Sequence, residues 1–485
     1  MRLASQISLL VLALCLAAAG GCGTSVPEGA LVLTQTPPDA PVAPDGGNLL
    51  DARYPAGSRV ILALSPFKPD NIRVLSKGLV AAGGPIVSPD GKEVVFSGKS
   101  TTVSAWQIYR ATLSGGRPKA LTALPAGAMD PAILPNGGLV FSSPVPKAGD
   151  AWRSTNRPAL YSQAAGSPPR RITFGTQAAV EPTVLTDGRI LFVSAQPSGT
   201  NPASPRLGLF TINNDGTEIT AYAAEHDGAD IVHRPRELLD GRIGFLAANS
   251  DARADLLWAE AVRTARPFAS RTALLTFPAG RCRSVEPGGE GALLLSVESR
   301  GMADRSMHGN YGIYRLSPGA TGLGQPVFDD PALNDIEAAR LAPRPMPQGH
   351  ISVMNETRHS GTLLCMDANR TTYPTNHIKA VRVRVLAEME KGKVTSLGEV
   401  PLQADGSFMI EAPSDVPLGF EALDPQGGVL RRLPPSIWVR AGENRSCLGC
   451  HEPHNRSPRN FRPLAVNVPP VILGQSGTSL TGGTP

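Results

Sequence analysis

The sequence predicts an all-β protein in which a β-propeller of five to six blades, over residues 56–345, precedes a small β-sandwich-like domain, over residues 346–462. Composition supports this prediction, because the 485 residues include 51 glycines and 46 prolines but only 5% aromatic residues, as in turn-rich β proteins. Within the first region a unit of about fifty residues repeats, a period typical of propeller blades. Its short apolar strands alternate with tight turns and lack helical periodicity.

The first 22 residues have the pattern of a signal peptide. Arg2 supplies a positive charge, and the apolar core at 7–19 is shorter than the roughly twenty residues that span a bilayer. The box at 19–22 resembles the cleavage site of bacterial lipoproteins. This resemblance implies a lipid anchor on Cys22 and an exported protein at the periplasmic side of the outer membrane or at the cell surface. The alternative is an ordinary signal peptide that leaves Cys22 as a thiol.

Residues 23–55 are rich in Pro, Gly, Ala and Asp, and they are predicted to form a linker. The repeats follow, and each has a proline, a short apolar run, a tight turn and a strand. The four clearest copies begin at Pro85, Pro131, Pro182 and Pro235. Their Asp-Gly or Asn-Gly pairs predict hairpin turns. A weaker fifth copy spans 285–296, and we expect a sixth blade to close the ring around 336–341. The repeated aromatic residues are assigned packing roles only.

The second region has a different pattern. Strands are predicted at 361–366, 378–385, 405–413 and 418–423, which indicates a small antiparallel β domain. The tail at 463–485 carries no charge, is rich in Gly, Ser, Thr and Pro, and is predicted to be disordered.

A short motif near the end of this domain, Cys447-Leu448-Gly449-Cys450-His451, is the attachment sequence for a c-type haem. Cys447 and Cys450 would bond covalently to the two porphyrin vinyl groups, and His451 would be the proximal ligand of the iron. The other interpretations are a redox dithiol, half of a zinc site, or chance. A zinc site needs a second ligand pair, and a thioredoxin-like dithiol needs a βαβ surround; neither is visible. Because haem c is attached outside the cytoplasm, the export signal supports one covalent haem c.

The distal ligand of this haem decides between two functions. A protein ligand on the distal side makes an electron carrier, whereas an open side permits chemistry on small ligands. His359 and His377 are the first candidates, followed by Met366 and Met409, although each is also compatible with an ordinary surface or core position.

Two further cysteines, Cys282 and Cys365, remain after lipidation and haem attachment. In an oxidising compartment they are candidates for a disulfide bond, and the alternative is two buried thiols.

Arginines dominate the charge around the motif. Between residues 428 and 462 only Glu443 and Glu452 oppose the seven arginines Arg431, Arg432, Arg440, Arg445, Arg456, Arg459 and Arg462. Some are expected to pair with the haem propionates, and the others to form a basic rim for an acidic redox partner protein. The formal net charge of the whole chain is only +5, which does not indicate nucleic-acid binding.

Two stretches resemble known families. Residues 88–91, Ser-Pro-Asp-Gly, resemble the signature of TolB-like propeller blades, and 361–365 together with 438–452 resemble the hydrazine synthase alpha subunit and its relatives. The second resemblance implies a haem protein with an enzymatic relative. Those subunits carry a second haem motif and a tyrosine four residues beyond the motif histidine. Here there is one motif, and Asn455 stands at that position.

These departures favour a lipid-anchored electron carrier with one haem. A haem enzyme of the hydrazine synthase alpha-like group, acting on small nitrogen compounds, is the first alternative. A propeller scaffold with an accessory haem is the second.

Overall fold

The computed structural model describes thirteen segments of the chain, which together contain both predicted domains. They are residues 29–38, 53–145, 157–175, 177–196, 206–223, 231–248, 258–274, 281–298, 310–320, 322–371, 378–388, 393–450 and 460–474. Among them no helix is long and apolar enough to cross a membrane. Cys22, His377, His451 and Asn455 lie outside the described residues.

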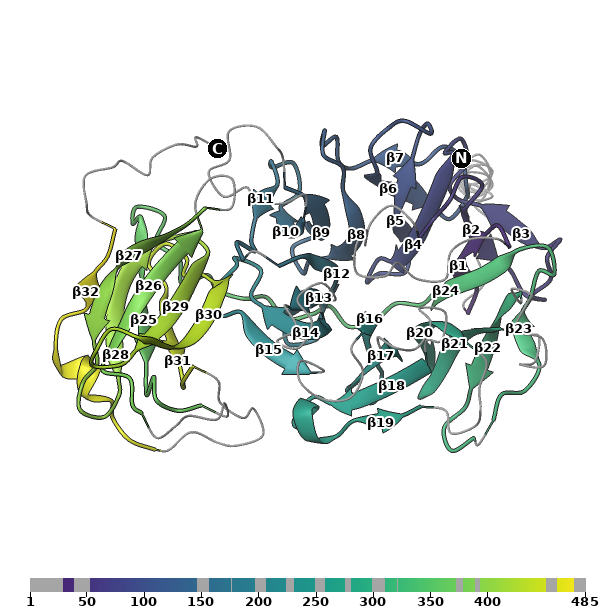
Figure 1. The fold of residues 1–485 in the computed structure, drawn as a ribbon. Helices are drawn as coiled ribbons and strands as arrows, with labels where there is room; N and C mark the ends of the chain where they lie inside the picture. The colour runs from purple at the N-terminus through teal and green to yellow at the C-terminus, as the bar shows by residue number, and fades with distance from the viewer. Residues whose placement is uncertain are drawn as a thin grey trace, which may run out of the picture.

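Six four-stranded sheets surround a common axis and confirm the predicted propeller (Figure 1). In order from the axis outward, blade 1 consists of β24 (Asn334–Arg340), β1 (Leu31–Thr36), β2 (Arg59–Ala63) and β3 (Ile72–Val74). Blade 2 consists of β4 (Ala81–Val87), β5 (Glu93–Lys99), β6 (Gln107–Thr112) and β7 (Lys119–Ala120). Blade 3 consists of β8 (Met129–Ile133), β9 (Leu139–Pro144), β10 (Pro158–Gln163) and β11 (Arg170–Arg171).

The remaining three blades follow the same order. Blade 4 consists of β12 (Ala179–Val184), β13 (Ile190–Gln196), β14 (Arg206–Ile212) and β15 (Thr220–Ala223). Blade 5 consists of β16 (Ile231–Glu237), β17 (Arg242–Ala248), β18 (Trp258–Arg263) and β19 (Thr272–Ala273), with the short 3-10 helix η1 (Pro267–Ala269) before β19. Blade 6 consists of β20 (Cys282–Gly289), β21 (Ala292–Glu298), β22 (Tyr311–Leu316) and β23 (Pro326–Phe328).

Blade 1 closes the ring with strands from both ends of the propeller segment. β24 supplies the strand expected around 336–341, and it pairs antiparallel with β1. β1 lies within 23–55, so the prediction of a linker over that whole range is wrong. All six residues of β1 are buried. Leu31 and Leu33 join the core between blades 1 and 6, and Val32 joins the core between blades 1 and 2.

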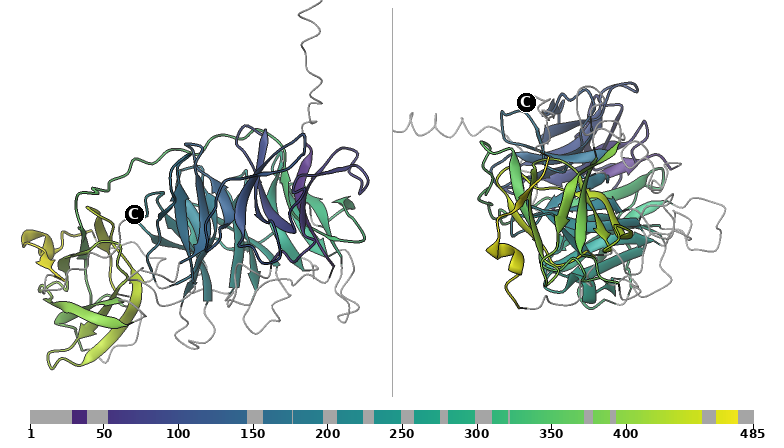
Figure 2. Two further views of the ribbon diagram at one scale, coloured as in Figure 1. Left: turned by 90° about the horizontal axis from the view of Figure 1, so that it is seen from above. Right: turned by 60° about the vertical axis from the view of Figure 1, so that its left-hand side comes forward.

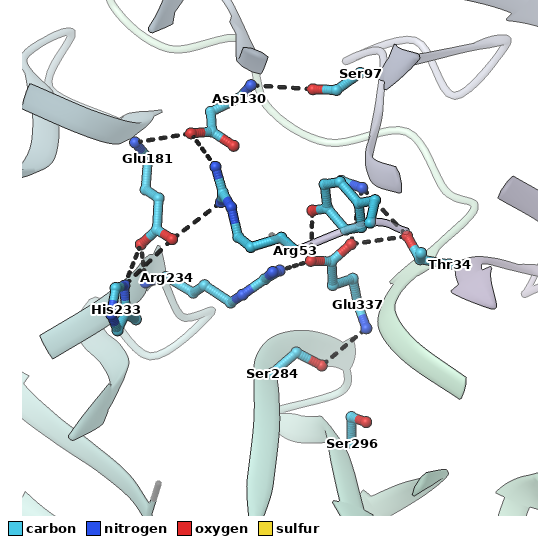
Figure 3. A network of polar contacts seen from close by, with 12 residues as sticks. Thr34, Arg53, Ser97, Asp130, Glu181, His233, Arg234, Ser284, Ser296 and Glu337 are labelled. Atoms are coloured by element: carbon cyan, nitrogen blue, oxygen red, sulfur yellow. Dashed lines mark hydrogen bonds and ion pairs between the residues drawn. The ribbon is translucent and has the colours of Figure 1, made fainter. Parts of the chain in front are cut away.

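A buried polar network joins the inner strands at the axis (Figure 3). The guanidinium of Arg53 donates to Asp130 Oδ2 of blade 3 at 2.7 Å and to Glu181 Oε1 of blade 4 at 3.0 Å. Glu337 of blade 1 pairs with Arg234 of blade 5. These charges are removed from water but meet opposite charges, which is the condition for burying them.

The four blade residues of this network, Asp130, Glu181, Arg234 and Glu337, share an unusual backbone. Each has φ between 53° and 59° at a bulge of an inner strand, a left-handed conformation that is uncommon outside glycine. Three of the four directly precede the proline that begins a repeat. The sequence therefore contained a signal for this network, a charged residue before the repeat proline, that the prediction did not use.

The second domain is a β-sandwich, as predicted. One sheet consists of β31 (Asn444–Cys447), β25 (Ser360–Cys365), β28 (Phe408–Pro413) and β32 (Val471–Ile472), and the other of β27 (Val394–Pro401), β26 (Arg382–Glu388), β29 (Leu418–Leu423) and β30 (Val429–Ile437). Their inner faces enclose an apolar core that includes Leu363, Val385, Phe408 and Phe420.

The sandwich extends further along the chain than predicted. The 3-10 helix η3 (Leu464–Asn467) precedes β32, which pairs with β28, and Leu473 is buried in the sandwich core. The predicted disordered tail therefore begins too early, because residues up to 474 belong to the domain.

The sandwich stands beside the propeller, and the linker between them crosses the propeller surface (Figure 2). Arg344 N donates to Pro89 O of blade 2 at 2.9 Å, and Gln348 N donates to Thr186 O of blade 4 at 2.9 Å. The linker is thus fixed to two blades before it enters the second domain.

Candidate haem-attachment site

The two thiols of the motif lie at one edge of the sandwich. β31 runs parallel to β25 with Cys447 opposite Cys365. Met366 N donates to Cys447 O at 2.9 Å, and Cys450 N donates to Arg370 O at 3.2 Å. Both thiols are half-buried and contact the sandwich core. An apolar edge with two thiols separated by two residues is a donor set that fits the vinyl groups of a haem, while His451 lies outside the described residues.

The strand that carries Cys447 is attached to the propeller by an arginine. The Arg445 guanidinium donates to Trp438 O and to Ile219 O, each at 2.9 Å. Ile219 directly precedes β15 of blade 4, so this side chain links β31 to the β14–β15 hairpin. We call the contacts of Trp438, Glu443 and Arg445 with this hairpin the propeller clamp.

Glu443 forms the second part of the clamp. Its carboxylate accepts from Glu218 N of the hairpin at 2.9 Å and from Arg440 N at 2.7 Å. Only 2% of the residue is exposed, and this burial raises its pKa. A charged acceptor of two backbone N–H groups makes strong hydrogen bonds, so Glu443 fixes the turn that leads into β31.

Trp438 forms the third part. Its indole Nε1 donates to Gly216 O at 3.1 Å, and its ring meets the ring of Phe174 from blade 3 edge to face, with centroids 6.2 Å apart. The Arg440 guanidinium lies 4.6 Å from the centroid of the same Phe174 ring. A Cβ at Gly361 would lie 2.6 Å from Arg440 O, so β25 needs glycine where this turn crosses it.

Most of the described arginines near the motif are bound within the chain. Arg431 donates to Ala368 O at 3.0 Å, Arg432 pairs with Glu421, and Arg440 pairs with Asp415 at 2.7 Å. Together with Arg445, four of the seven have internal partners, while Arg462 is exposed and Arg456 and Arg459 lie outside the described residues. Fewer arginines than expected are therefore available for a basic rim. The sequence could not reveal this, because the groups that bind these arginines come from distant strands.

The distal-ligand candidates differ in their distance from the thiols. His359 precedes β25 at the end opposite to Cys365, and six extended residues place it roughly 20 Å away along the sheet. The structure thus does not bring His359 to the thiols. Met366 directly follows Cys365, and its N–H donates to Cys447 O. Met409 pairs across the sheet with Leu364, the residue before Cys365. His377 lies outside the described residues.

Of the two possibilities for Cys282 and Cys365, a disulfide bond or two buried thiols, the structure has two buried thiols. Cys282 belongs to the core between blades 5 and 6, and its thiol donates to Ser284 O at 3.4 Å. Cys365 lies in the core of the sandwich. Burial raises the pKa of Cys282 to about 12, which keeps it an unreactive thiol.

Comparison with known proteins agrees with this architecture. Residues 366–452 match the family model of the hydrazine synthase alpha subunit middle domain. Hydrazine synthase subunit alpha of Kuenenia stuttgartiensis is 23% identical over 356 residues, which are 58% of this chain and 42% of that protein. The match thus spans less than half of that relative's length.

The solved structure of Kuenenia stuttgartiensis hydrazine synthase has a TM-score of 0.77 at 18% identity, over 91% of this chain and 72% of the other. A putative TolB from Agrobacterium tumefaciens has a TM-score of 0.37 at 15% identity, over 51% of this chain and 88% of the other. The chain is therefore similar to hydrazine synthase in its fold, and its second domain matches the family model of the alpha subunit middle domain.

Proposed function

We propose that this chain is an exported c-type cytochrome that carries electrons through one haem bonded to Cys447 and Cys450. The observation that supports it is the pair of half-buried thiols at an apolar sandwich edge, on a strand attached to the propeller. The bound group supplies one-electron redox chemistry at its iron. The chain attaches the group, orients it and limits its contact with water.

Each of these tasks has named residues. Cys447 and Cys450 would hold the group covalently, and His451 would ligate its iron. The propeller clamp fixes the strand before the first thiol. Arg370, whose carbonyl accepts from Cys450 N, forms no ion pair within the described residues. Its guanidinium is therefore available for a haem propionate, and Arg suits such bidentate contacts.

The distal ligand in this proposal is Met366. It directly follows β25, and its N–H donates to Cys447 O, whereas His359 lies at the far end of β25. With His451 and Met366 as its ligands the iron would have no open position and a raised reduction potential, as suits electron transfer.

A second candidate function is supported by the similarity to hydrazine synthase. It is a haem enzyme acting on small nitrogen compounds, with an open distal side. The tyrosine position of that family is Asn455 here, which counts against the same reaction. Spin state separates the two functions, because only the enzyme needs an open iron.

Attachment is tested with the full chain expressed in a host that matures c-type cytochromes. The double variant Cys447→Ala/Cys450→Ala should lose haem staining on a denaturing gel and all visible absorption. Cys282→Ala, which removes a buried thiol of the propeller, is the control and should stain normally. A stained band from the double variant would refute the attachment site.

Distal ligation is tested by electron paramagnetic resonance and redox titration. The unmodified protein should be low-spin, and Met366→Ala should become high-spin with a lower reduction potential. Met409→Ala should change neither property. A high-spin unmodified protein that binds nitric oxide readily would instead support the enzyme.

The location of the protein is part of the proposal. Attachment of haem c requires export, and the box at 19–22 supplies a lipid anchor at Cys22. The partner is a redox protein. Most of the described arginines near the motif are bound internally, so the proposal does not require an acidic partner.

A further inference from the structure

A groove with a volume of about 670 Å³ lies between the outer strands of blades 1 and 2. Its walls come from 57–59 at the start of β2, from β3 with the residues that follow it, and from the β6–β7 turn at 114–116. In Figure 1 β2 and β3 lie on the side of the propeller away from the sandwich, and β6 and β7 lie at the top of the view. The groove is therefore separate from the haem-attachment site.

Its walls carry positive charge without a counter-charge. Arg59, Arg73 and Lys77 line the groove, and no Asp or Glu does. Arg59 Nε donates to the neutral Gln35 at 2.9 Å, and Arg73 donates to the backbone carbonyl of Leu113. None of the three cations forms an ion pair within the described residues, in contrast to Arg236 and Arg384, which meet carboxylates. Cations of one sign in a concave site attract and concentrate anions.

The rest of the lining suits an organic anion. The hydroxyl group of the exposed Ser114 can supply a hydrogen bond, and Ile72 and Leu79 add apolar surface. The volume is in the range of pockets that hold small organic molecules, about 300–1,000 Å³.

The turn at 114–116 leaves room for the Arg73 side chain in the wall of the groove. Gly115 has φ of 82°, and a Cβ there would lie 3.0 Å from Arg73 Cδ. Glycine therefore lets the Arg73 side chain lie across the turn. An arginine held in this way presents a planar fork of donors, which matches the geometry of a phosphate.

We propose that this groove binds a phosphate-bearing organic anion with two or more negative charges. The three cationic side chains, which have no carboxylate among the lining residues, match a ligand with this negative charge. The planar guanidinium of Arg73 matches the geometry of a phosphate group. The same chemistry is found in soluble phosphate esters and in the headgroups of anionic phospholipids, and the test separates these two sources.

The first arm is calorimetric titration of the full chain with inorganic pyrophosphate at low ionic strength. The second is flotation with vesicles of phosphatidylcholine that contain phosphatidylglycerol, compared with phosphatidylcholine alone. The variant is Arg73→Gln/Lys77→Gln. The control is Lys68→Gln/Lys92→Gln, which removes the same charge at two exposed lysines outside the groove.

The groove variant should weaken binding about tenfold or more, as expected for the loss of charge-assisted contacts. The control should stay within about twofold, and Arg73→Lys should retain part of the affinity because it keeps the charge. An effect in the pyrophosphate arm identifies a soluble ligand, and an effect in the vesicle arm alone identifies a lipid headgroup. Equal losses in both double variants, or no binding to either probe, would overturn the proposal.

Discussion

Asp335 is a single carboxyl group that makes the stability of the propeller depend on pH. It is fully buried in β24, where it accepts from Gln35 Nε2 at 2.9 Å and from Asp330 N at 2.7 Å. Burial raises its pKa to about 8. The folded chain therefore keeps a proton that the unfolded chain releases above its ordinary pKa near 4.

The sign of the effect follows from this proton. The stabilisation is complete below the unfolded pKa and is lost as pH rises through about 8. Because one pKa unit corresponds to about 1.4 kcal/mol, the free energy of unfolding should fall by up to several kcal/mol between about pH 5 and pH 9. Urea titrations across this range measure it. Asp335→Asn, which resembles the protonated carboxyl, should flatten the dependence, and exposed Asp240→Asn should not. Equal slopes for both variants would contradict the assignment.

At the scale of elements, the propeller clamp decides how firmly β31 is held. Arg445→Met keeps the aliphatic stem but leaves the carbonyls of Trp438 and Ile219 without their donor. Hydrogen bonds to a charged group contribute roughly 1.5–3 kcal/mol. We expect a loss of about 2–3 kcal/mol in unfolding free energy and a lower ratio of covalent haem to protein. Arg242→Met, which loses only an exposed pair with Asp240, is the control.

The ratio of covalent haem to protein tests whether the clamp positions the thiols, and not only whether it stabilises the fold. Arg445→Lys can still reach one carbonyl and should recover part of the haem. If Arg445→Met and Arg242→Met attach equal amounts of haem, the clamp does not position the thiols.

The same elements show what the sequence could and could not reveal. Repeated prolines and Asp-Gly turns predicted the blades, because those signals are local and recur. β1 was missed, since its apolar run at 31–33 is short and lies among residues typical of a linker. The clamp was missed for another reason: Arg445 and Ile219 are 226 residues apart, and no local pattern reports such a contact. Cys447 and Cys450 could be proposed from the sequence because attachment of haem c requires a fixed local spacing.

At the scale of the whole molecule, Glu337 is the residue whose contacts hold several blades together at the propeller axis. Its carboxylate accepts from Thr34 Oγ1 at 2.7 Å, from Tyr54 OH at 2.7 Å and from Gly84 N at 2.8 Å, and it pairs with Arg234. One side chain thus connects blades 1, 2 and 5 at the axis (Figure 3). Because only 2% of the residue is exposed, water cannot replace these partners.

Glu337→Gln should therefore destabilise the whole propeller. The amide keeps the shape of the side chain but removes the buried carboxylate that pairs with Arg234, whose side chain is only 12% exposed, and breaking such a pair costs roughly 3–5 kcal/mol. The matched control is Glu290→Gln, because Glu290 shares the left-handed backbone, with φ of 53°, but is exposed and pairs with Arg315 at the surface. An exposed pair contributes at most about 1 kcal/mol. Urea unfolding followed by circular dichroism compares the two variants. Equal losses would show that backbone conformation, and not the buried charge, governs closure of the ring.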